Sequence, residues 1–136
     1  MKRCVFLCAA VSLFYILALT MPAQHIEPAA VMVKQEQHAV LMECTAYCNS
    51  WYCTGHRKGD ADYGKTFFGT TAGLGTVAAD INLFKPGTRL YIPGYGLGVV
   101  SDKGSGITGN KLDLWFPDYT TAKLYGRKQL QVQVLD

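Results

Sequence analysis

The stretch GVVSDKGSGITGNKLDLWF, at residues 98–116, joins two short β-type runs through a glycine-rich turn. Each run carries one aspartate, with Asp102 at the end of the first run and Asp113 in the middle of the second. The turn is too short for a phosphate-binding loop with its lysine and following helix. The stretch therefore predicts two strands, a tight turn and two acidic side chains within a β-rich domain.

Similar short runs lie on both sides of this stretch, at residues 76–79, 89–92 and 129–135, and glycine-containing turns separate them. In the last run, apolar residues alternate with glutamines, as a strand with one buried face requires. The spacing predicts a small, mainly β barrel, with the last run closing the sheet. One helix is predicted late in the chain, because Asp118 suits an N-cap, residues 119–125 contain no helix breaker, and Gly126 suits the left-handed position after the helix.

Asp113 is expected to share a strand face with Trp115, while Leu112 and Leu114 point to the opposite face, because side chains alternate along a strand. A carboxyl group beside an aromatic wall and other carboxylates has its pKa raised by desolvation and by like charge. Asp113 is therefore a candidate general acid. Exposure of its side chain to solvent is the alternative interpretation.

Asp80 directly follows the apolar run 76–79, and Asp102 likewise ends an apolar run. Acidic groups in such positions are costly to bury unless they have partners. Two interpretations stay open for this pair. Each aspartate caps a turn through bonds to backbone N–H groups, or the two join Asp113 in one acidic site.

The N-terminal part differs in kind from the rest of the chain. Residues 1–23 place two basic residues before a long apolar run, which is typical of a signal peptide or of a retained N-terminal membrane anchor. Residues 24–42 are predicted to be a spacer, with a short amphipathic helix over residues 31–41 as the alternative. Residues 43–136 are predicted to be one domain, and an export segment places this domain outside the cytoplasm.

Composition narrows the classes of function. The chain has 136 residues, which is enough for one domain of ordinary size. Its formal charge is +3, and residues 24–136 contain 11 Lys and Arg and 10 Asp and Glu. A nearly neutral domain gives no support to nucleic-acid binding.

Three cysteines and a histidine form a C-x3-C-x4-C-x2-H pattern at Cys44, Cys48, Cys53 and His56. This spacing matches no common structural zinc pattern closely, so no metal is included in the predicted site. A disulfide between Cys48 and Cys53, free buried thiols and a zinc site all remain open.

Four segments together resemble the 3D domain, a three-aspartate family of bacterial cell-wall proteins. They are ECTAYC at residues 43–48, YGKTFFGTTAGLGTVAAD at 63–80, FKPGTRLYIPGYGLGVVSDKGSGITGNKLDLWF at 84–116 and YGRKQLQVQVL at 125–135. The family includes stationary-phase survival proteins and is similar to the catalytic barrel of membrane-bound lytic transglycosylase A. The resemblance spans residues 43–136, and it implies a six-stranded double-psi β-barrel with one short helix in its C-terminal half.

The resemblance also implies an activity, peptidoglycan lytic transglycosylation. In this reaction the β-1,4 bond between N-acetylmuramic acid (MurNAc) and N-acetylglucosamine (GlcNAc) breaks without water, and the product closes to a 1,6-anhydro ring. By resemblance, Asp113 acts first as general acid and then as general base, and Asp80 and Asp102 orient it. No cofactor is implied. A non-catalytic peptidoglycan-binding module and a hydrolase that uses the same aspartates with water are the alternatives.

The implied partner is the glycan strand of peptidoglycan, and the implied location is extracellular or cell-wall associated, with membrane contact only through residues 1–23. The chain departs from the family in its turn, where Thr108 stands at a common lysine position, and this affects the expected substrate affinity. By the same resemblance, the predicted substrate contacts are Tyr47, His56, Lys58, Thr71, Gly104 and Trp115.

Overall fold

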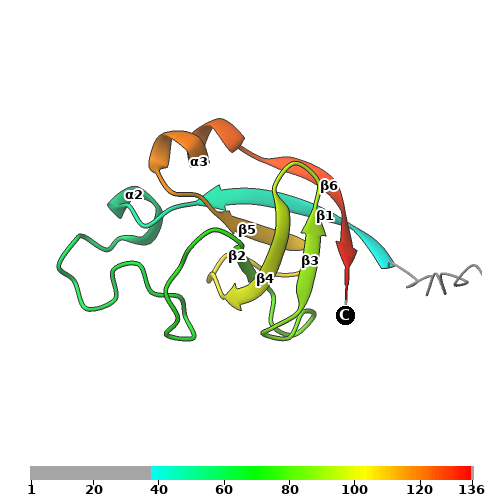
Figure 1. Cartoon of the computed structure of the whole chain (residues 1–136), viewed down its shortest axis with the longest axis horizontal. Helices are drawn as coiled ribbons and strands as arrows, with labels where there is room; N and C mark the ends of the chain where they lie inside the picture. Colours follow the sequence, from blue (N-terminus) through cyan, green and yellow to red (C-terminus); the bar gives the residue numbers. More distant parts are fainter. Residues whose placement is uncertain (1–37, 136) are drawn as a thin grey trace, which may run out of the picture. The chain divides into compact units, whose positions relative to one another are not determined.

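The structure, a computed structural model, describes residues 38–135, in which six strands close into a barrel and two short helices lie outside it (Figure 1). The helix α3 packs against β1. The segment between α2 and β2 forms a long loop region at the left of Figure 1. The elements are β1 (His38–Tyr47), α2 (Trp51–Thr54), β2 (Thr76–Ala79), β3 (Arg89–Ile92), β4 (Gly96–Asp102), β5 (Lys111–Trp115), α3 (Tyr119–Tyr125) and β6 (Lys128–Val134).

The strand order around the barrel is β1-β5-β2-β4-β3-β6. Two neighbouring pairs, β1 with β5 and β2 with β4, are parallel, and the other pairs are antiparallel. The first three strands correspond to the last three, β1 to β4, β2 to β5 and β3 to β6. When each strand is exchanged with its counterpart, the order around the closed barrel stays the same, and the parallel pair β1–β5 becomes the parallel pair β2–β4. This internal two-fold relation is the double-psi arrangement, so the predicted fold class is confirmed. β6 pairs with both β1 and β3 and closes the barrel, as the sequence predicted.

The barrel interior is filled by alternate side chains from all six strands. Leu112 and Leu114 are fully buried, as the alternation in the sequence predicted, and Phe116 packs against the same core. Burying one such side chain stabilises the fold by about 1.5–3 kcal/mol. The fully buried members of this core are Met42, Cys44, Val77, Ala79, Leu90, Ile92, Val100, Leu112, Leu114 and Val132.

The structure differs from the sequence-based expectation at the start of the domain. β1 begins at His38, so residues 38–42 form part of a strand and belong neither to a spacer nor to a helix. Val40 and Met42 on this strand contact the core, which explains why the strand extends past the predicted boundary. The signal or anchor predicted for residues 1–23 lies outside the described residues. No helix within residues 38–135 is long and apolar enough to cross a membrane.

The helices also differ in part from the prediction. Asp118 caps α3 as predicted, because its carboxylate accepts bonds from the Thr121 backbone N–H at 2.9 Å and the Thr121 hydroxyl at 2.7 Å. Gly126 has the expected positive φ of 68°, but its ψ of −138° lies outside the left-handed helical region. A second short helix, α2, was not predicted, and it ends at Gly55, which has left-handed geometry.

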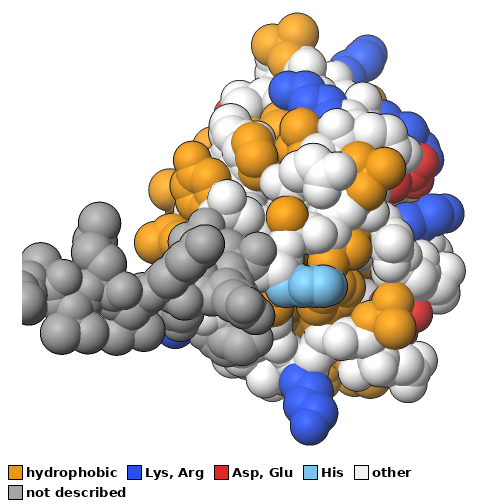
Figure 2. Space-filling view, turned by 90° about the vertical axis from the view of Figure 1, so that its right-hand side faces the viewer, with side chains coloured by type: hydrophobic (Ala, Val, Ile, Leu, Met, Phe, Trp, Pro, Cys, Tyr) orange, Lys and Arg blue, Asp and Glu red, His pale blue; other side chains and the backbone are white. Residues whose placement is uncertain are grey.

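Several large apolar side chains are exposed among the described residues. Figure 2 shows them in separate groups on one face of the molecule, with Lys and Arg side chains toward the edge of that face. Scattered exposed apolar side chains are usual on protein surfaces. This face therefore offers no single large docking surface.

Gly98→Ala is expected to destabilise the barrel by about 1–3 kcal/mol, because overpacked cores force side chains to shift. A Cβ at Gly98 would lie 2.6 Å from Val77 Cγ2 and 3.3 Å from Ile92 Cδ1. The free energy of unfolding in urea measures this effect. Gly73→Ala is the matched control, since a Cβ there meets nothing within 4 Å. Equal stability of the two variants would contradict the expected crowding.

Candidate active site

Ala78 on β2 lies at the centre of the candidate site. It pairs with Asp113 of β5 on one side and with Asp102 of β4 on the other. Residues directly opposite each other on neighbouring strands share a face of the sheet. Val77 and Ala79 point into the core, so Ala78 and both aspartates face outward. The pairing therefore brings Asp102 and Asp113 to the same outer face, across one small side chain.

A β-bulge decides where Asp102 points. The register of β2 with β4 shifts between Val77 and Ala78, so that Val77 pairs with Val100 but Ala78 pairs with Asp102. Ser101 is the extra residue. Strict alternation would place Asp102 on the same side as the core residue Val100. The bulge reverses this and turns Asp102 toward the face that carries Asp113.

Asp113 is partly buried in the middle of β5. Its Oδ1 accepts a hydrogen bond of 2.7 Å from the Thr45 hydroxyl on the parallel neighbour β1. Burial raises the pKa of the Asp113 carboxyl, the nearby charge of Asp102 raises it further, and the Thr45 bond opposes the shift. A carboxyl group held toward its neutral form is suited to donate a proton.

Asp102 is buried, with a side chain that is 8% exposed. Its Oδ2 accepts a bond of 2.7 Å from the Tyr47 hydroxyl. Its Oδ1 accepts bonds from the backbone N–H groups of Phe67, at 2.7 Å, and Lys103, at 2.8 Å. Burial and the Asp102 bond raise the pKa of the Tyr47 hydroxyl, so Tyr47 stays a donor. Three hydrogen-bond donors thus offset the cost of removing the Asp102 carboxylate from water.

Asp80 has a different setting at the surface end of β2. Its Oδ2 accepts a bond of 2.8 Å from the Gly109 N–H, and its Oδ1 accepts bonds of 3.0 Å from the backbone and side-chain N–H groups of Asn82. The bonds from Gly109 and Asn82 lower the pKa of the Asp80 carboxyl. Asp80 therefore anchors the glycine-rich turn, as the turn interpretation of the sequence expected.

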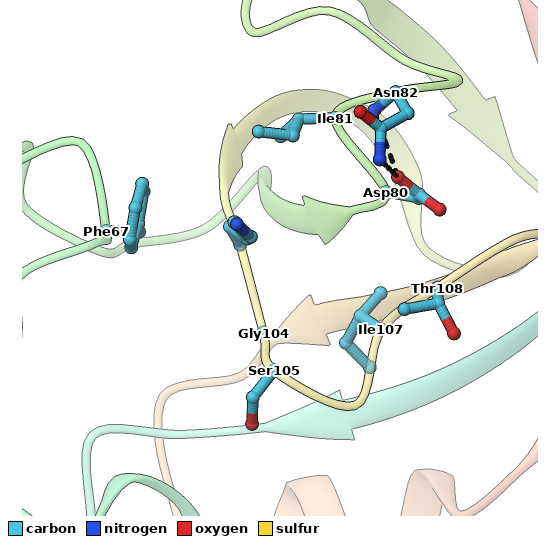
Figure 3. Close-up of a pocket in the computed structure, with 9 residues that line it drawn as sticks. Phe67, Asp80, Ile81, Asn82, Gly104, Ser105, Ile107 and Thr108 are labelled. Atoms are coloured by element: carbon cyan, nitrogen blue, oxygen red, sulfur yellow. Dashed lines mark hydrogen bonds between the residues drawn. The ribbon is translucent and has the colours of Figure 1, made fainter.

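Two pockets adjoin Asp80 and Asp102, and Asp113 lines neither of them. The first has a volume of about 500 Å³ and the second about 460 Å³. In Figure 3, Phe67 lies on one side of the first pocket, Asp80 and Asn82 lie on the other, and the turn from Gly104 to Thr108 runs below. Phe67 and Lys103 line both pockets. The first is lined by Phe67, Asp80, Ile81, Asn82, Lys103, Gly104, Ser105, Ile107 and Thr108, and the second by Thr54, His56, Asp62, Lys65, Thr66, Phe67, Gly69, Asp102 and Lys103.

The structure brings most of the predicted substrate contacts near the aspartates. His56 lines the second pocket with Asp102, and Gly104 lines the first with Asp80. Tyr47 pairs with Trp115 in the β1–β5 register, on the face that carries Asp113. The Trp115 indole N–H donates a bond of 2.8 Å to Asn49 Oδ1, which fixes the ring.

Two of the predicted contacts lie elsewhere. Lys58 and Thr71 are exposed and line neither pocket. Thr71 instead forms an isolated β-bridge with Lys65 in the long loop region. Their assignment as substrate contacts stays a prediction.

Three residues near the site were not predicted as contacts: Thr45, Phe67 and Lys103. The β1–β5 pairing brings Thr45 to Asp113, and its sequence position gave no sign of this long-range partner. Lys103 directly follows Asp102, so its proximity was readable from the sequence. Phe67 is a 65% exposed aromatic side chain, and exposure of this kind has no sequence signal.

The three cysteines within residues 38–135 are free thiols, and two of them are close together. Cys48 Sγ and Cys53 Sγ lie 3.2 Å apart at the two ends of a turn that includes Ser50. Cys44 is separate, within the core, where burial raises the pKa of its thiol to about 11. Residues 38–135 contain no group of three or more His, Cys, Asp or Glu side chains that could hold a metal ion.

Oxidation is expected to join Cys48 and Cys53 in a disulfide. The two thiols lose two protons and two electrons to an oxidant such as oxidised glutathione. Closing this short loop is expected to stabilise the domain by about 2 kcal/mol. Mass spectrometry of the intact chain and thermal unfolding before and after oxidation measure both effects. The Cys44→Ala variant should still form the disulfide, whereas a bond that requires Cys44 would contradict the pairing.

The C-terminal part of this chain is similar to known proteins. Residues 75–136 match the model of the 3D domain family. Two proteins of Bacillus subtilis (strain 168) align with this chain over 60 residues: the putative cell wall shaping protein YabE at 35% identity and the cell wall-binding protein YocH at 37% identity. The alignment covers 44% of this chain but 15% of YabE and 21% of YocH. The matched chain thus corresponds to a small part of either relative.

Among solved structures, the barrel is similar in fold to crystal structures of MltA from E. coli. One of them has a TM-score of 0.44 and 23% identity, and covers 53% of this chain and 27% of MltA. Another, described as MltA with bound chitohexaose, has a TM-score of 0.46 and 22% identity over the same shares of the chains. This likeness concerns the fold alone. Residues 75–136, which contain Asp80, Asp102 and Asp113, are thus a match to the 3D domain family, as the sequence motifs predicted.

Proposed function

We propose that this chain is a peptidoglycan lytic transglycosylase that cleaves the β-1,4 bond between MurNAc and GlcNAc and leaves a 1,6-anhydro product. The observation that carries this proposal is the setting of Asp113. It is a partly buried carboxyl group on an outward face, and burial and the neighbouring Asp102 raise its pKa. Such a group is held ready to give up a proton to a bound substrate.

The reaction needs one acid–base group and no water. Neutral Asp113 donates its proton to the glycosidic oxygen, and the bond from that oxygen to C1 of the muramoyl ring breaks. The Asp113 carboxylate then takes the proton from the 6-hydroxyl of the same ring, and O6 forms a bond to C1. Asp113 returns to its neutral form, and the released GlcNAc end carries the donated proton.

Asp102 and Asp80 are positioning residues in this mechanism. The carboxylate of Asp102 keeps the Asp113 proton in place by like charge, and its own bonds to Tyr47, Phe67 and Lys103 hold the surrounding loops. Asp80 holds the glycine-rich turn through Gly109. The pockets beside Asp80 and Asp102 bind the glycan, and no cofactor takes part.

The two Bacillus subtilis relatives support a role at the cell wall, since one is a putative cell wall shaping protein and the other a cell wall-binding protein. The predicted export segment at residues 1–23 agrees with a location outside the cytoplasm. Within this proposal the partner is the peptidoglycan glycan strand. The name of the second relative also favours a second candidate function, a wall-binding module without catalysis.

The test is to incubate the full chain with purified peptidoglycan and to analyse the soluble products by mass spectrometry. Anhydro-muropeptides are the expected products. Products with reducing muramic ends, which are heavier by one water, would replace the transglycosylase with a hydrolase. Retained wall binding without any released product would favour the binding module and contradict the catalytic proposal.

A further inference from the structure

We propose that Phe67 and Lys103 form a subsite for a carboxylate-bearing sugar, and that this subsite makes the chain prefer an anionic MurNAc-containing strand over a neutral GlcNAc polymer. The inference rests on the proposed function, because it assigns the substrate preference of the same site. It gives a role to two residues outside the set of three aspartates. Their part is substrate selection and not the chemistry of cleavage.

Phe67 and Lys103 occupy the boundary between the two pockets. Both residues line the pocket of about 500 Å³ beside Asp80 and the pocket of about 460 Å³ beside Asp102. A glycan strand that extends from one pocket into the other must therefore pass over these two side chains. Figure 3 shows Phe67 on one side of the first pocket and Asp80 on the other, with Ile81 between them in this view.

Asp102 connects this boundary to the reaction site. A single carboxylate oxygen, Asp102 Oδ1, accepts the backbone N–H of Phe67 at 2.7 Å and that of Lys103 at 2.8 Å. Asp102 itself is buried and faces the same side as Asp113. The side chains of Phe67 and Lys103 are exposed. Their backbone N–H groups are held by Asp102, which lies next to the proposed acid Asp113.

The chemistry of the pair fits an anionic sugar. The Phe67 ring is 65% exposed, and sugar rings stack on such flat apolar faces. Lys103 Nζ lies 5.1 Å from the centre of that ring. Within residues 38–135, no carboxylate lies at ion-pair distance from Lys103. Lys103 is also the single cation among the described residues that line the first pocket. Alongside the backbone hydrogen bonds to Asp80, the charge of Lys103 lowers the pKa of that carboxyl in the same pocket, but the two groups form no ion pair. A sugar stacked on Phe67 therefore has an ammonium group beside it that is available for a direct contact.

The sugar that meets both requirements is MurNAc, whose lactyl ether ends in a carboxylate. GlcNAc has the same ring and lacks this acid group, so a GlcNAc polymer can stack on Phe67 but cannot pair with Lys103. A charge-assisted contact of this kind corresponds to about a tenfold difference in affinity or more. In strands that carry peptides the lactyl group is amidated, and the remaining carboxylates belong to the peptide.

The experiment measures binding of the full chain to three ligands by calorimetry: peptide-free MurNAc-GlcNAc oligosaccharide, the same oligosaccharide with its peptides, and chitohexaose. Lys103→Gln is expected to weaken binding of the peptide-free oligosaccharide about tenfold and to leave chitohexaose binding unchanged. Lys103→Arg keeps the positive charge and should retain most of the affinity. Lys85→Gln is the matched control, because Lys85 is exposed and lines neither pocket.

Other outcomes overturn the subsite. If Lys103→Gln and the unsubstituted chain bind each of the three ligands with equal affinity, the subsite is excluded. If the unsubstituted chain nevertheless cleaves glycan, the proposed function stands without the subsite. An effect confined to the peptide-bearing ligand would assign Lys103 to a peptide carboxylate and overturn the sugar subsite. If the unsubstituted chain neither binds nor cleaves any glycan, the proposed function fails and the subsite fails with it.

Discussion

Asp113→Asn is expected to lower the rate of anhydro-muropeptide release by about 10²–10⁴-fold, the usual contribution of a general acid or base. The amide of Asn cannot donate a proton to the glycosidic oxygen or take one from the 6-hydroxyl. It can still accept the bond that Thr45 donates to Asp113, so the geometry of β1 and β5 should be kept. Product release from purified peptidoglycan, followed over time by mass spectrometry, measures the effect.

The same substitution is expected to leave the domain at least as stable as the unsubstituted chain at pH 7. The folded-state pKa of Asp113 is raised, mainly by burial, so its protonated form contributes stability. This contribution is fully present below the unfolded pKa of about 4 and is lost as the pH rises through the folded pKa. Thermal unfolding of the variant and the unsubstituted chain should therefore differ most near pH 7 and least at acidic pH.

Asp60→Asn is the matched control for both measurements. Asp60 is an exposed aspartate whose side chain accepts a bond from the Arg57 N–H, and it lines neither pocket. This variant should release products at the unsubstituted rate. Undiminished product release by Asp113→Asn would contradict the proposed mechanism, although the barrel fold and the match of residues 75–136 to the 3D domain would be unaffected.

Asp102→Ala is expected to reduce the free energy of unfolding by about 3 kcal/mol, because a buried carboxylate and its charge-assisted hydrogen bonds are lost. The substitution leaves the Tyr47 hydroxyl and the N–H groups of Phe67 and Lys103 without their acceptor. Asp102→Asn keeps one acceptor oxygen and should lose less stability. Urea unfolding of the two variants measures the difference.

A pH profile separates this structural effect from the effect on catalysis. The charge of Asp102 helps to raise the pKa of Asp113, so Asp102→Asn should lower that pKa. The loss of activity at rising pH would then begin at a lower pH than in the unsubstituted chain. An unchanged profile would show that Asp102 acts only through the structure of the loops.

The sequence by itself determined the local elements of this protein. Short apolar runs between glycine-containing turns predicted β2 and β3 with the bounds that the structure has, and β6 to within one residue at each end. Alternation placed Leu112 and Leu114 in the core and Asp113 on the opposite face, as observed. These features depend on neighbours in the sequence, and side-chain periodicity reports them directly.

Only the tertiary structure decided how the site is assembled. The parallel pairing of β1 with β5 joins Thr45 to Asp113 across 68 positions of the chain, and no local pattern indicates such a partner. Alternation alone would have turned Asp102 into the core, but the bulge at Ser101 turns it outward. A bulge forms because neighbouring strands must fit around a closed barrel, so its position is set by the whole sheet. For the same reason, the meeting of Asp102 and Asp113 over Ala78 is a property of the closed barrel and not of either strand.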